Sequence, residues 1–459
     1  MSEVAVAAPP ADPLLNRGPF LAVLSQGLPL AFGLASHAII NLVDLALIGR
    51  LGDDAVQSAH VASTWNFVPM IVGNCVSTAL LARLSRRLGD GDAAGARGLN
   101  VRAQWFMLWL GLLIGVVTAV PAGWFVDGTG LAGHVRDDAV HYLIVSNLGC
   151  LPMFVLMQTT AAMRAAGEAM VPFGLLLLAN VLNLALNLVL LFGWPAAGIP
   201  AIGVAGAAYG SVSARTVAAV LAVGWLARRT HVLTLRGNGV ARRREPVVVP
   251  LLQDSWPQAL QIGLRASVVL VLTILVQQRF GDAATVSLGV ATRFDTLVLF
   301  SSLGFANAAT AYAGRAIVVG WSGRARLAGL HAALQSGVFG ALWVALFNAE
   351  PQLLLGWCRP DASDELHRLT VLYFATAAWG QVFGAIALGA IGAVYGSGRM
   401  IAPLLVDLVG FGCAAALLWR VAGGAADLRD IYLALVWGMV AVAVCQLMFV
   451  AVGRWARPL

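Results

Sequence analysis

Three polar residues near the start of the chain lie at a spacing that brings them to one face of a helix. His37, Asn41 and Asp44 are separated by four and three residues in an otherwise apolar segment, and these steps match the period of an α-helix. One carboxylate with polar neighbours suffices to bind and release a proton. The pattern predicts an ion-binding face at Asp44; the alternative is that Asp44 only hydrogen-bonds the end of its own helix.

A second stripe of polar residues follows further along the chain. Asn180, Asn183 and Asn187 are spaced by three and four residues among leucines. In a membrane such a stripe points into the protein, because lipid offers no hydrogen bonds to the amides. Either these amides form part of a binding site, or they only join neighbouring helices.

Five more ionisable residues fall inside strongly apolar segments, where a charge costs at least ~2.5 kcal/mol at a helix centre. Arg215 stands near the end of its segment, so its side chain is expected to reach the membrane surface. Arg265, Arg293 and Asp295 are candidates for a second polar site in the C-terminal half. Alternatively, they form structural ion pairs with one another or with Asp407.

The elements that carry these residues are membrane-spanning helices. Of the 459 residues, 59% are hydrophobic and 11% are charged, which leaves too little polar surface for a soluble protein of this length. Crossing about 30 Å of hydrocarbon takes roughly 20 apolar residues in a helix. Twelve segments satisfy this requirement, at residues 19–49, 57–85, 101–126, 139–163, 169–193, 201–227, 253–279, 283–314, 326–348, 366–395, 400–420 and 430–453. The sequence predicts an all-α integral membrane protein with twelve transmembrane helices.

Basic residues indicate how these helices are oriented, and all of them are arginine. With the N-terminus inside, nineteen arginines lie on the cytoplasmic side and seven lie outside. The positive-inside rule therefore predicts that both termini are cytoplasmic. The all-arginine set favours a GC-rich genome, hence a multi-pass protein of a bacterial inner (plasma) membrane. The net charge of +7 follows from this topology, so no nucleic-acid partner is expected.

An internal repeat divides the chain into two lobes. Leu51–Ala55 aligns with Phe280–Ala284 at an offset of 229 residues, and Gly167–Pro172 aligns with Gly398–Pro403. A parallel repeat of this kind implies two six-helix bundles related by a pseudo-twofold axis along the membrane normal. The predicted parts are a cytoplasmic tail at 1–18, an N-lobe with helices 1–6 at 19–228, a cytoplasmic linker at 229–250, and a C-lobe with helices 7–12 at 251–455.

Several motifs resemble those of one family. Asn41–Gly52 resembles the first-helix pattern of MATE (multidrug and toxic compound extrusion) transporters, in which an intramembrane Asp precedes a Gly-x-Leu-Gly turn. Met163–Pro172 is similar to the family's loop after helix four. Asn183–Asn187 and Gly203–Ala208 are similar to its helix five and the start of helix six. The resemblance covers nearly the whole chain and implies an ion-coupled exporter whose two lobes enclose a central cavity.

The resemblance also implies roles for individual residues. In archaeal and DinF-like MATE proteins, the first and fifth helices form a cation or proton site. The matching residues of this chain are Asp44, Asn180, Asn183, Asn187 and, in the sixth helix, Ser211. The family commonly has Asp at the position of Asn187, so Asp44 remains as the carboxylate of the site.

A departure from the family pattern bears on the coupling ion. NorM-like sodium-coupled members carry Glu in the seventh helix and Asp in the tenth, where this chain has Arg265 and Gly384. A sodium site built from those two carboxylates cannot exist here in the same form. The resemblance is therefore closer to the DinF-like branch than to NorM-like members. It implies H+ coupling through Asp44, with Na+ coupling as the alternative.

The expected activity is export of amphipathic, often cationic, drugs or metabolites by alternating access. The alternative in the same superfamily is a flippase for lipid-linked oligosaccharides or polyprenyl lipids, in which Arg265 and Arg293 would hold a pyrophosphate. No enzyme is expected, because the sequence contains no HExxH motif and no phosphate-cradling glycine loop. We expect no metal site and no cofactor besides the coupling ion. The expected partners are a small-molecule substrate and the lipid bilayer, and the expected state is a monomer.

Overall fold

The computed structural model describes residues 12–228, 231–235, 246–358, 363–424 and 427–457. Residues 1–11 of the predicted tail, and 229–230 and 236–245 of the predicted linker, lie outside them. Within the described part, the chain forms the helices α1 (Pro19–Gly49), α2 (Asp53–Gly89), α3 (Ala93–Ala119), α4 (Ala122–Asp127), α5 (Gly133–Leu148), α6 (Cys150–Ala166), α7 (Met170–Phe192), α8 (Val204–Leu226), α9 (Val248–Val318), α10 (Ser322–Ala349), α11 (Pro351–Cys358), α12 (Asp364–Ala375), α13 (Ala378–Gly396), α14 (Ile401–Ala422) and α15 (Leu428–Val452).

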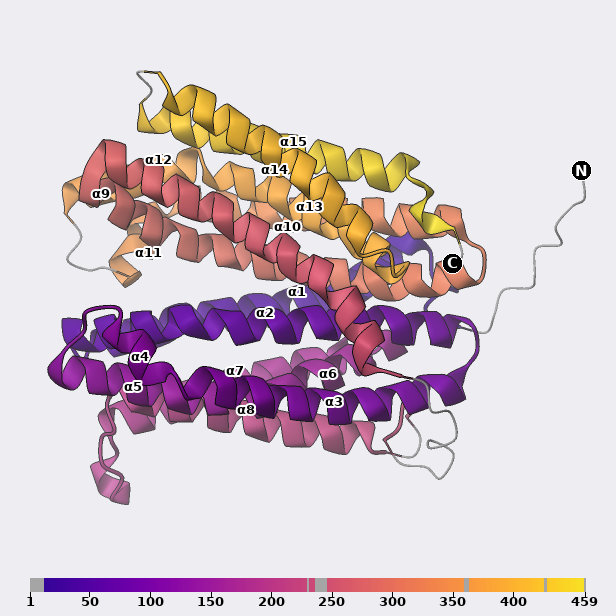
Figure 1. Ribbon diagram of the computed structural model, residues 1–459, viewed down its shortest axis with the longest axis horizontal. Helices are drawn as coiled ribbons and strands as arrows, with labels where there is room; N and C mark the ends of the chain where they lie inside the picture. The colour runs from indigo at the N-terminus through magenta and orange to yellow at the C-terminus, as the bar shows by residue number, and fades with distance from the viewer. Residues whose placement is uncertain (1–11, 229–230, 236–245, 359–362, 425–426, 458–459) are drawn as a thin grey trace, which may run out of the picture.

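The seventh and eighth predicted segments form one continuous element, α9. A straight helix of its 71 residues would be about 107 Å long, far more than the ~30 Å of a hydrocarbon core. The backbone at Gly281 is non-helical, with φ 77° and ψ −165°, a conformation that glycine adopts without a Cβ clash. Figure 1 shows α9 turning back on itself. The element therefore contains two crossings.

The twelve predicted crossings are present. Among the described residues, eleven helices are long and apolar enough to span a membrane, and α9 spans it twice. Two predicted segments are interrupted in the structure. The fourth is divided between α5 and α6 at Gly149, and the tenth is divided between α12 and α13 at Thr376 and Ala377.

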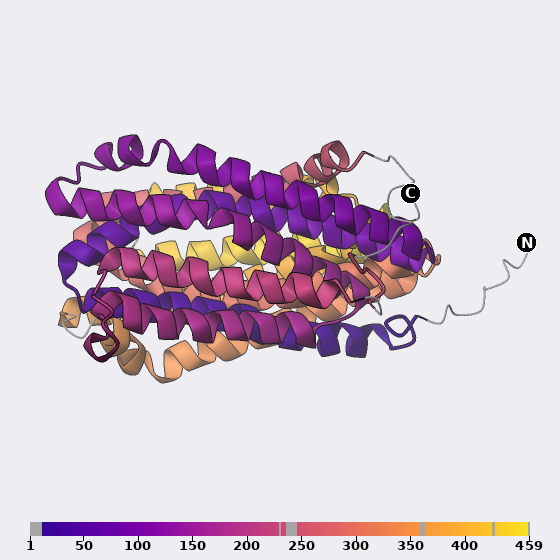
Figure 2. The ribbon, with the colours of Figure 1, turned by 90° about the horizontal axis from the view of Figure 1, so that it is seen from below.

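The helices lie in two layers. Figure 1 shows α2 to α8 in one layer and α10 to α15 in the other. The first part of α9 starts beside the first layer and runs obliquely into the second, and the perpendicular view of Figure 2 shows the same long, nearly parallel bundle. Helix α1 packs on both α7 and α9. We call α1 to α8 the N-terminal half and α9 to α15 the C-terminal half.

Both ends of the described chain lie on the same side of the bundle, at the turn between α9 and α10. Asp12 binds Arg315, the last basic residue of α9, with hydrogen bonds of 2.6 and 2.7 Å. Ala456 accepts a hydrogen bond of 2.5 Å from Ser322, the first residue of α10. We call this side of the molecule the termini end, and the opposite side the far end.

Glycines let the two halves approach closely. A Cβ atom at Gly304 of α9 would lie 2.3 Å from the backbone nitrogen of Ala31 of α1. Such contact distances are possible only without a side chain, and small residues at helix interfaces are typical of membrane proteins. The glycine therefore sets how closely α1 packs on α9, which brings the polar residues of α1 next to the C-terminal half.

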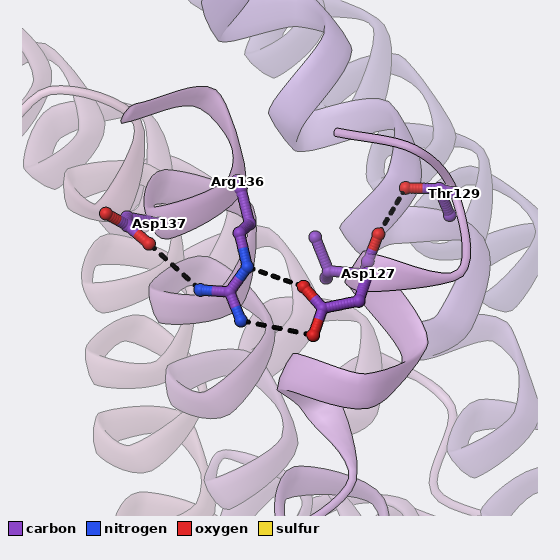
Figure 3. A network of polar contacts seen from close by, with 5 residues as sticks. Asp127, Thr129, Arg136 and Asp137 are labelled. Atoms are coloured by element: carbon purple, nitrogen blue, oxygen red, sulfur yellow. Dashed lines mark hydrogen bonds and ion pairs between the residues drawn. The ribbon is translucent and has the colours of Figure 1, made fainter. Parts of the chain in front are cut away.

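An exposed polar network joins α4 to α5 at the far end. Arg136 donates from Nε to Asp127 (2.5 Å) and from Nη1 to Asp137 (3.0 Å), as Figure 3 shows. Thr129 donates to the carbonyl of Val126 in the same turn. Exposed ion pairs of this kind contribute little to stability, because water screens the charges. The network fixes a loop outside the apolar spans.

Candidate functional site

A cavity lies between the two halves and is lined by side chains of α1, α2, α6, α7, α8 and α9. The sequence-predicted residues on its wall are His37, Asn41, Asp44, Asn180, Asn183 and Ser211. Met70, Met157 and Phe300 contribute apolar surface. Convergent polar groups in an otherwise apolar cavity are typical of a small-molecule site.

Asp44 is held by the amides of α7. Asn187 donates to Asp44 Oδ1 over 2.8 Å. The Asn183 amide has one orientation in which both its nitrogen and its oxygen form hydrogen bonds. In that orientation the nitrogen donates to the two Asp44 oxygens, each at 3.2 Å, and the oxygen accepts from the Ser211 hydroxyl at 2.7 Å. A Cβ atom at Gly210 would lie 2.1 Å from Asn187 Oδ1, so this glycine makes room for the amide. The carboxylate therefore receives hydrogen bonds that orient it toward the cavity.

The other two predicted residues of the α1 face lie on the same cavity. His37 is hydrogen-bonded to Asn180, and Asn180 also donates to the Ser36 hydroxyl over 2.7 Å. Asn41 is exposed and also lines the cavity. All seven sequence-predicted residues of this group thus lie together in the N-terminal half, with Asn187 one layer behind the wall.

The prediction that Arg215 reaches the membrane surface is wrong. Arg215 follows Ser211 by one helical turn on α8, lines the same cavity and interacts electrostatically with both Asp44 and His37. The reason is the rotation of α8 about its axis, which turns the face of Ser211 inward. The four-residue spacing from Ser211 was the signal in the sequence that pointed to this position.

Sequence reasoning also missed polar residues on three other helices. Asn74 and Ser77 line the cavity from α2, Thr160 and Arg164 line it from α6, and Asn307 lines it from α9. Each pair is spaced by three or four residues, so helical periodicity carried a signal. Asn307 belongs to the C-terminal half, which places the cavity between the halves.

The charged candidates of the C-terminal half do not gather at this cavity. Arg265 Nη2 lies 3.7 Å from Asp407 Oδ2, and Gln446 donates to Asp407 Oδ1 over 2.6 Å. Asp407 has no exposed surface. Arg265 is therefore part of an internal ion pair between α9 and α14, as the structural alternative predicted.

Asp295 and Arg293 also point elsewhere. Tyr373 and Gln381 donate to Asp295 Oδ2 over 2.5 and 3.0 Å. Arg293, two positions earlier on α9, lies 3.4 Å from the His60 ring of α2. Residues two apart face different sides of a helix. The three proposed cavity candidates of the C-terminal half thus lie at three separate places, and none lies on the described wall of the cavity.

Metal-binding side chains do not cluster in the described part of the chain. No three residues of His, Cys, Asp and Glu come together there in a way that could hold a metal ion. The chemistry that the cavity offers is that of one carboxylate, two guanidinium groups, an imidazole and several amides and hydroxyls.

The class of protein follows from this arrangement. Twelve crossings in two halves, with ionisable residues on a cavity between them, are typical of secondary transporters. A family model for MatE matches residues 29–189. This stretch contains α2 to α6 and most of α1 and α7.

Curated relatives and solved structures agree with this class. The chain is 26% identical over 429 residues to a probable multidrug resistance protein NorM of Rhizobium meliloti, covering 88% of each chain. It is 27% identical over 409 residues to the protein of the same name of Deinococcus radiodurans, again covering 88% of each chain. An outward-facing MATE family transporter of the MOP superfamily superimposes with a TM-score of 0.86 at 18% identity, covering 97% of this chain and 98% of that one.

The chain thus has the fold of MATE transporters and is similar to them in sequence, which supports a multi-pass membrane transporter rather than an enzyme. The prediction that the chain is closer to the DinF-like branch than to NorM-like members is not confirmed. The names of the relatives point the other way, toward NorM. The departure at Arg265 therefore did not distinguish the two branches.

Proposed function

We propose that the protein is a MATE-type exporter that couples efflux of amphipathic compounds to proton uptake at Asp44. The observation that carries this proposal is the position of Asp44 on the cavity wall, hydrogen-bonded by Asn187 and facing Arg215. Relatives named for multidrug resistance support the direction of transport. We further propose a monomer in a bacterial inner membrane that needs no cofactor.

Proton uptake at Asp44 changes what the cavity binds. The ionised carboxylate attracts a cationic group of a substrate, while the amides of Asn183 and Asn187 keep it oriented. Protonation removes this charge and weakens the attraction, so the substrate leaves when the cavity faces outward. The protein then returns to the inward-facing state with Asp44 protonated, and the proton is released to the inside. Proton and cationic group compete for one site, as antiport requires.

The amides favour a proton over Na+ as the coupling ion. A hard cation needs oxygen ligands, and the nitrogen atoms of Asn183 and Asn187 are the groups that face the carboxylate. These N–H groups would repel a cation placed on the same carboxylate oxygens. Rearrangement of both amides would be needed before Asp44 could take part in a sodium site.

We propose that the termini end faces the cytoplasm, because the nineteen arginines assigned to that side satisfy the positive-inside rule. The two halves then open and close around the cavity toward alternate sides of the membrane. The halves correspond to the proposed N-lobe at 19–228 and C-lobe at 251–455.

Transport by purified protein in liposomes tests this function. A proton gradient, acidic on the substrate-receiving side and imposed at fixed sodium concentration, should drive uptake of a fluorescent amphipathic amine. A sodium gradient imposed at uniform pH should not. Transport that follows only the sodium gradient would show that the coupling ion was assigned wrongly, and transport under neither gradient would contradict the function.

The flippase alternative relied on Arg265 and Arg293 at the cavity. In the structure, Arg265 lies beside Asp407 and Arg293 lies beside His60. We therefore do not retain it as a second candidate.

A further inference from the structure

A second cavity lies at the termini end, where the two halves meet, and the coupling mechanism does not use it. Its volume is about 560 Å³, within the range of roughly 300 to 1,000 Å³ that is usual for pockets that hold small molecules. The ends of α2 and α3 form one wall, with Arg83, Arg86, Arg87 and Arg102. The two ends of α9, together with Ser397 after α13, form the opposite wall. A molecule in this cavity therefore touches both halves.

The wall of this second cavity is basic. Of the described residues that line it, four are arginines and one, Asp90, is acidic. Two further carboxylates bind arginines from the sides, because Asp254 lies 2.7 Å from Arg83 and Asp92 lies 3.9 Å from Arg87. Four arginines then face three carboxylates, so positive charge remains in excess. Arginines that serve only the positive-inside rule need not converge on one cavity.

Arg86 extends from one half into the other. It donates from Nη1 to the carbonyl of Gly396, at the end of α13, over 3.4 Å. A Cβ atom at Gly398 would collide with the same nitrogen, so this glycine makes room for the guanidinium group. A Cβ atom at Gly89 of α2 would lie 2.8 Å from the backbone of Arg315 of α9. The cavity therefore keeps this form only while the halves stay closed against each other at the termini end.

The arginines of the cavity lie at the level of the membrane surface. Arg87 stands two residues beyond the predicted span 57–85, and Arg102 is the second residue of the predicted span 101–126. Trp105, three residues after Arg102 on α3, is 61% exposed. In an apolar span such a side chain faces lipid, and tryptophan is enriched where the hydrocarbon meets the headgroups. The basic cavity thus borders the bilayer at the depth of the lipid phosphates.

The opposite wall adds apolar surface. Val247 and Pro250 line the cavity at the start of α9. Val249 and Leu252, on the same turns of the chain, are exposed. An apolar surface therefore continues from the cavity to the outside of the protein. A soluble anion does not use such a surface, whereas a phospholipid carries both a phosphate group and acyl chains that can lie along it.

We propose that this cavity binds the phosphate groups of an anionic phospholipid, and that the bound lipid holds the two halves closed at the termini end. Guanidinium groups bind phosphate through paired, charge-assisted hydrogen bonds. Basic pockets between transmembrane helices bind the headgroups of cardiolipin, which carries two phosphates. A lipid on both walls binds the closed arrangement better than the open one, so it shifts the protein toward the state that is open at the far end. The lipid thereby regulates alternating access without entering the substrate cavity.

Lipid binding to purified protein tests the site. Native mass spectrometry in detergent compares cardiolipin with phosphatidylethanolamine, which has no net charge, on wild type, Arg86→Gln and Arg102→Gln. We expect the dissociation constant for cardiolipin to rise about tenfold in each variant, as for loss of a charge-assisted hydrogen bond. Binding of phosphatidylethanolamine should not change. Arg102→Gln leaves the contact between Arg86 and Gly396 in place, so the test does not depend on the folding of one variant.

Arg97→Gln is the matched control. Arg97 is exposed on the same helix as Arg102, donates to the carbonyl of Val232, and is not among the described residues that line the cavity. Its cardiolipin affinity should change less than about twofold, because an exposed charge is screened by salt. An equal loss in Arg97→Gln and in the two cavity variants would indicate general attraction to the basic surface and overturn the inference. Unchanged cardiolipin affinity in both cavity variants would overturn it as well.

Inorganic pyrophosphate distinguishes a lipid from a soluble source of phosphate. Pyrophosphate should compete weakly with cardiolipin on wild type, because it offers the phosphates without the acyl chains. If pyrophosphate binds wild type and cardiolipin does not, the cavity takes its phosphate from solution and the assignment of a lipid is wrong.

The closing effect is measured between the halves. Spin labels at Ala94→Cys of α3 and Gly323→Cys of α10, both exposed, report the distance between the halves at the termini end by double electron–electron resonance. Cardiolipin should increase the population of the shorter distance in wild type and not in Arg102→Gln. An unchanged distribution in wild type would show that the lipid does not hold the halves together, and this part of the inference would be wrong. Neither measurement uses a proton gradient, so a failure of the proposed proton coupling is distinguishable from a failure of the lipid site.

Discussion

Arg315, at the end of α9, holds Asp12 with two hydrogen bonds of 2.6 and 2.7 Å, although 303 residues separate them. The same guanidinium group donates to the carbonyl of Ala165 at the end of α6. The start of the described chain, the N-terminal half and the C-terminal half therefore meet at one side chain. Because the Arg315 side chain is only 5% exposed, the pair is well shielded from solvent.

This junction predicts a strong dependence on Asp12. Asp12→Asn should lower the free energy of unfolding by about 3 kcal/mol, since removing one partner leaves a buried charge uncompensated. Arg17→Gln is the matched control, because Arg17 is exposed and, among the described residues, donates only to Ser25; its effect should stay within about 0.5 kcal/mol. The thermal unfolding midpoint in detergent measures both. Equal midpoints for the two variants would show that the pair does not join the halves.

Asp44→Asn should fold and bind substrate but lose proton-driven export. The amide mimics the protonated carboxylate permanently and cannot release a proton. His37→Ala should be milder, and Asn183→Ala should slow transport about threefold to tenfold, because it removes a hydrogen bond that orients the carboxylate. Proton-driven uptake into liposomes measures all three. A wild-type rate for Asp44→Asn would falsify the mechanism.

Arg265→Glu should destabilise the protein and leave its substrate preference unchanged. In the structure Arg265 lies 3.7 Å from buried Asp407, so Glu would place two carboxylates together. Unfolding midpoints of Arg265→Gln, Asp407→Asn and the double variant form a thermodynamic cycle. The double variant should be more stable than the sum of the single losses predicts; additive losses would mean that the two side chains do not interact.

Glu168 introduces a pH dependence at the termini end. Its carboxylate lies 3.3 Å from the His231 ring and accepts a hydrogen bond of 3.2 Å from Trp225. The hydrogen bond with His231 lowers the pKa of Glu168 below its usual 4.5. Because the pKa is lower in the folded state, the stabilisation is present above pH 4.5 and is lost as the pH falls through the folded value.

Glu168→Gln should therefore flatten the acid side of the stability curve. We expect its unfolding midpoint to fall less than that of wild type on acidification from about pH 6 to about pH 3. Glu350→Gln, which changes an exposed carboxylate at the far end, should keep the wild-type pH profile. Parallel curves for Glu168→Gln and wild type would show that the contact with His231 contributes nothing.

Cysteine labelling tests the proposed orientation. In a cysteine-free background, Ser363→Cys at the far end should react with a membrane-impermeant maleimide in intact cells. Asp90→Cys, in the exposed turn between α2 and α3 at the termini end, should react only after the membrane is opened. The reverse pattern would invert the topology and with it the direction of transport.

The sequence by itself determined the twelve crossings, because the length and apolarity of a span are local properties set by the thickness of the membrane. It also determined that Asn180, Asn183 and Asn187 share one face, because helical spacing depends only on the period of the helix. The turn at Gly281 was visible only as a boundary between two apolar segments.

Tertiary structure decided which charges meet. The sequence placed Arg215 near the membrane surface and Arg265 near the cavity, and packing reverses both positions. The rotation of each helix about its axis depends on close contacts between distant segments, such as Gly304 against Ala31 and Gly210 against Asn187. A charge in an apolar span must find a partner or a cavity, and which of these it finds is fixed by that rotation, because 100° separates successive residues of a helix.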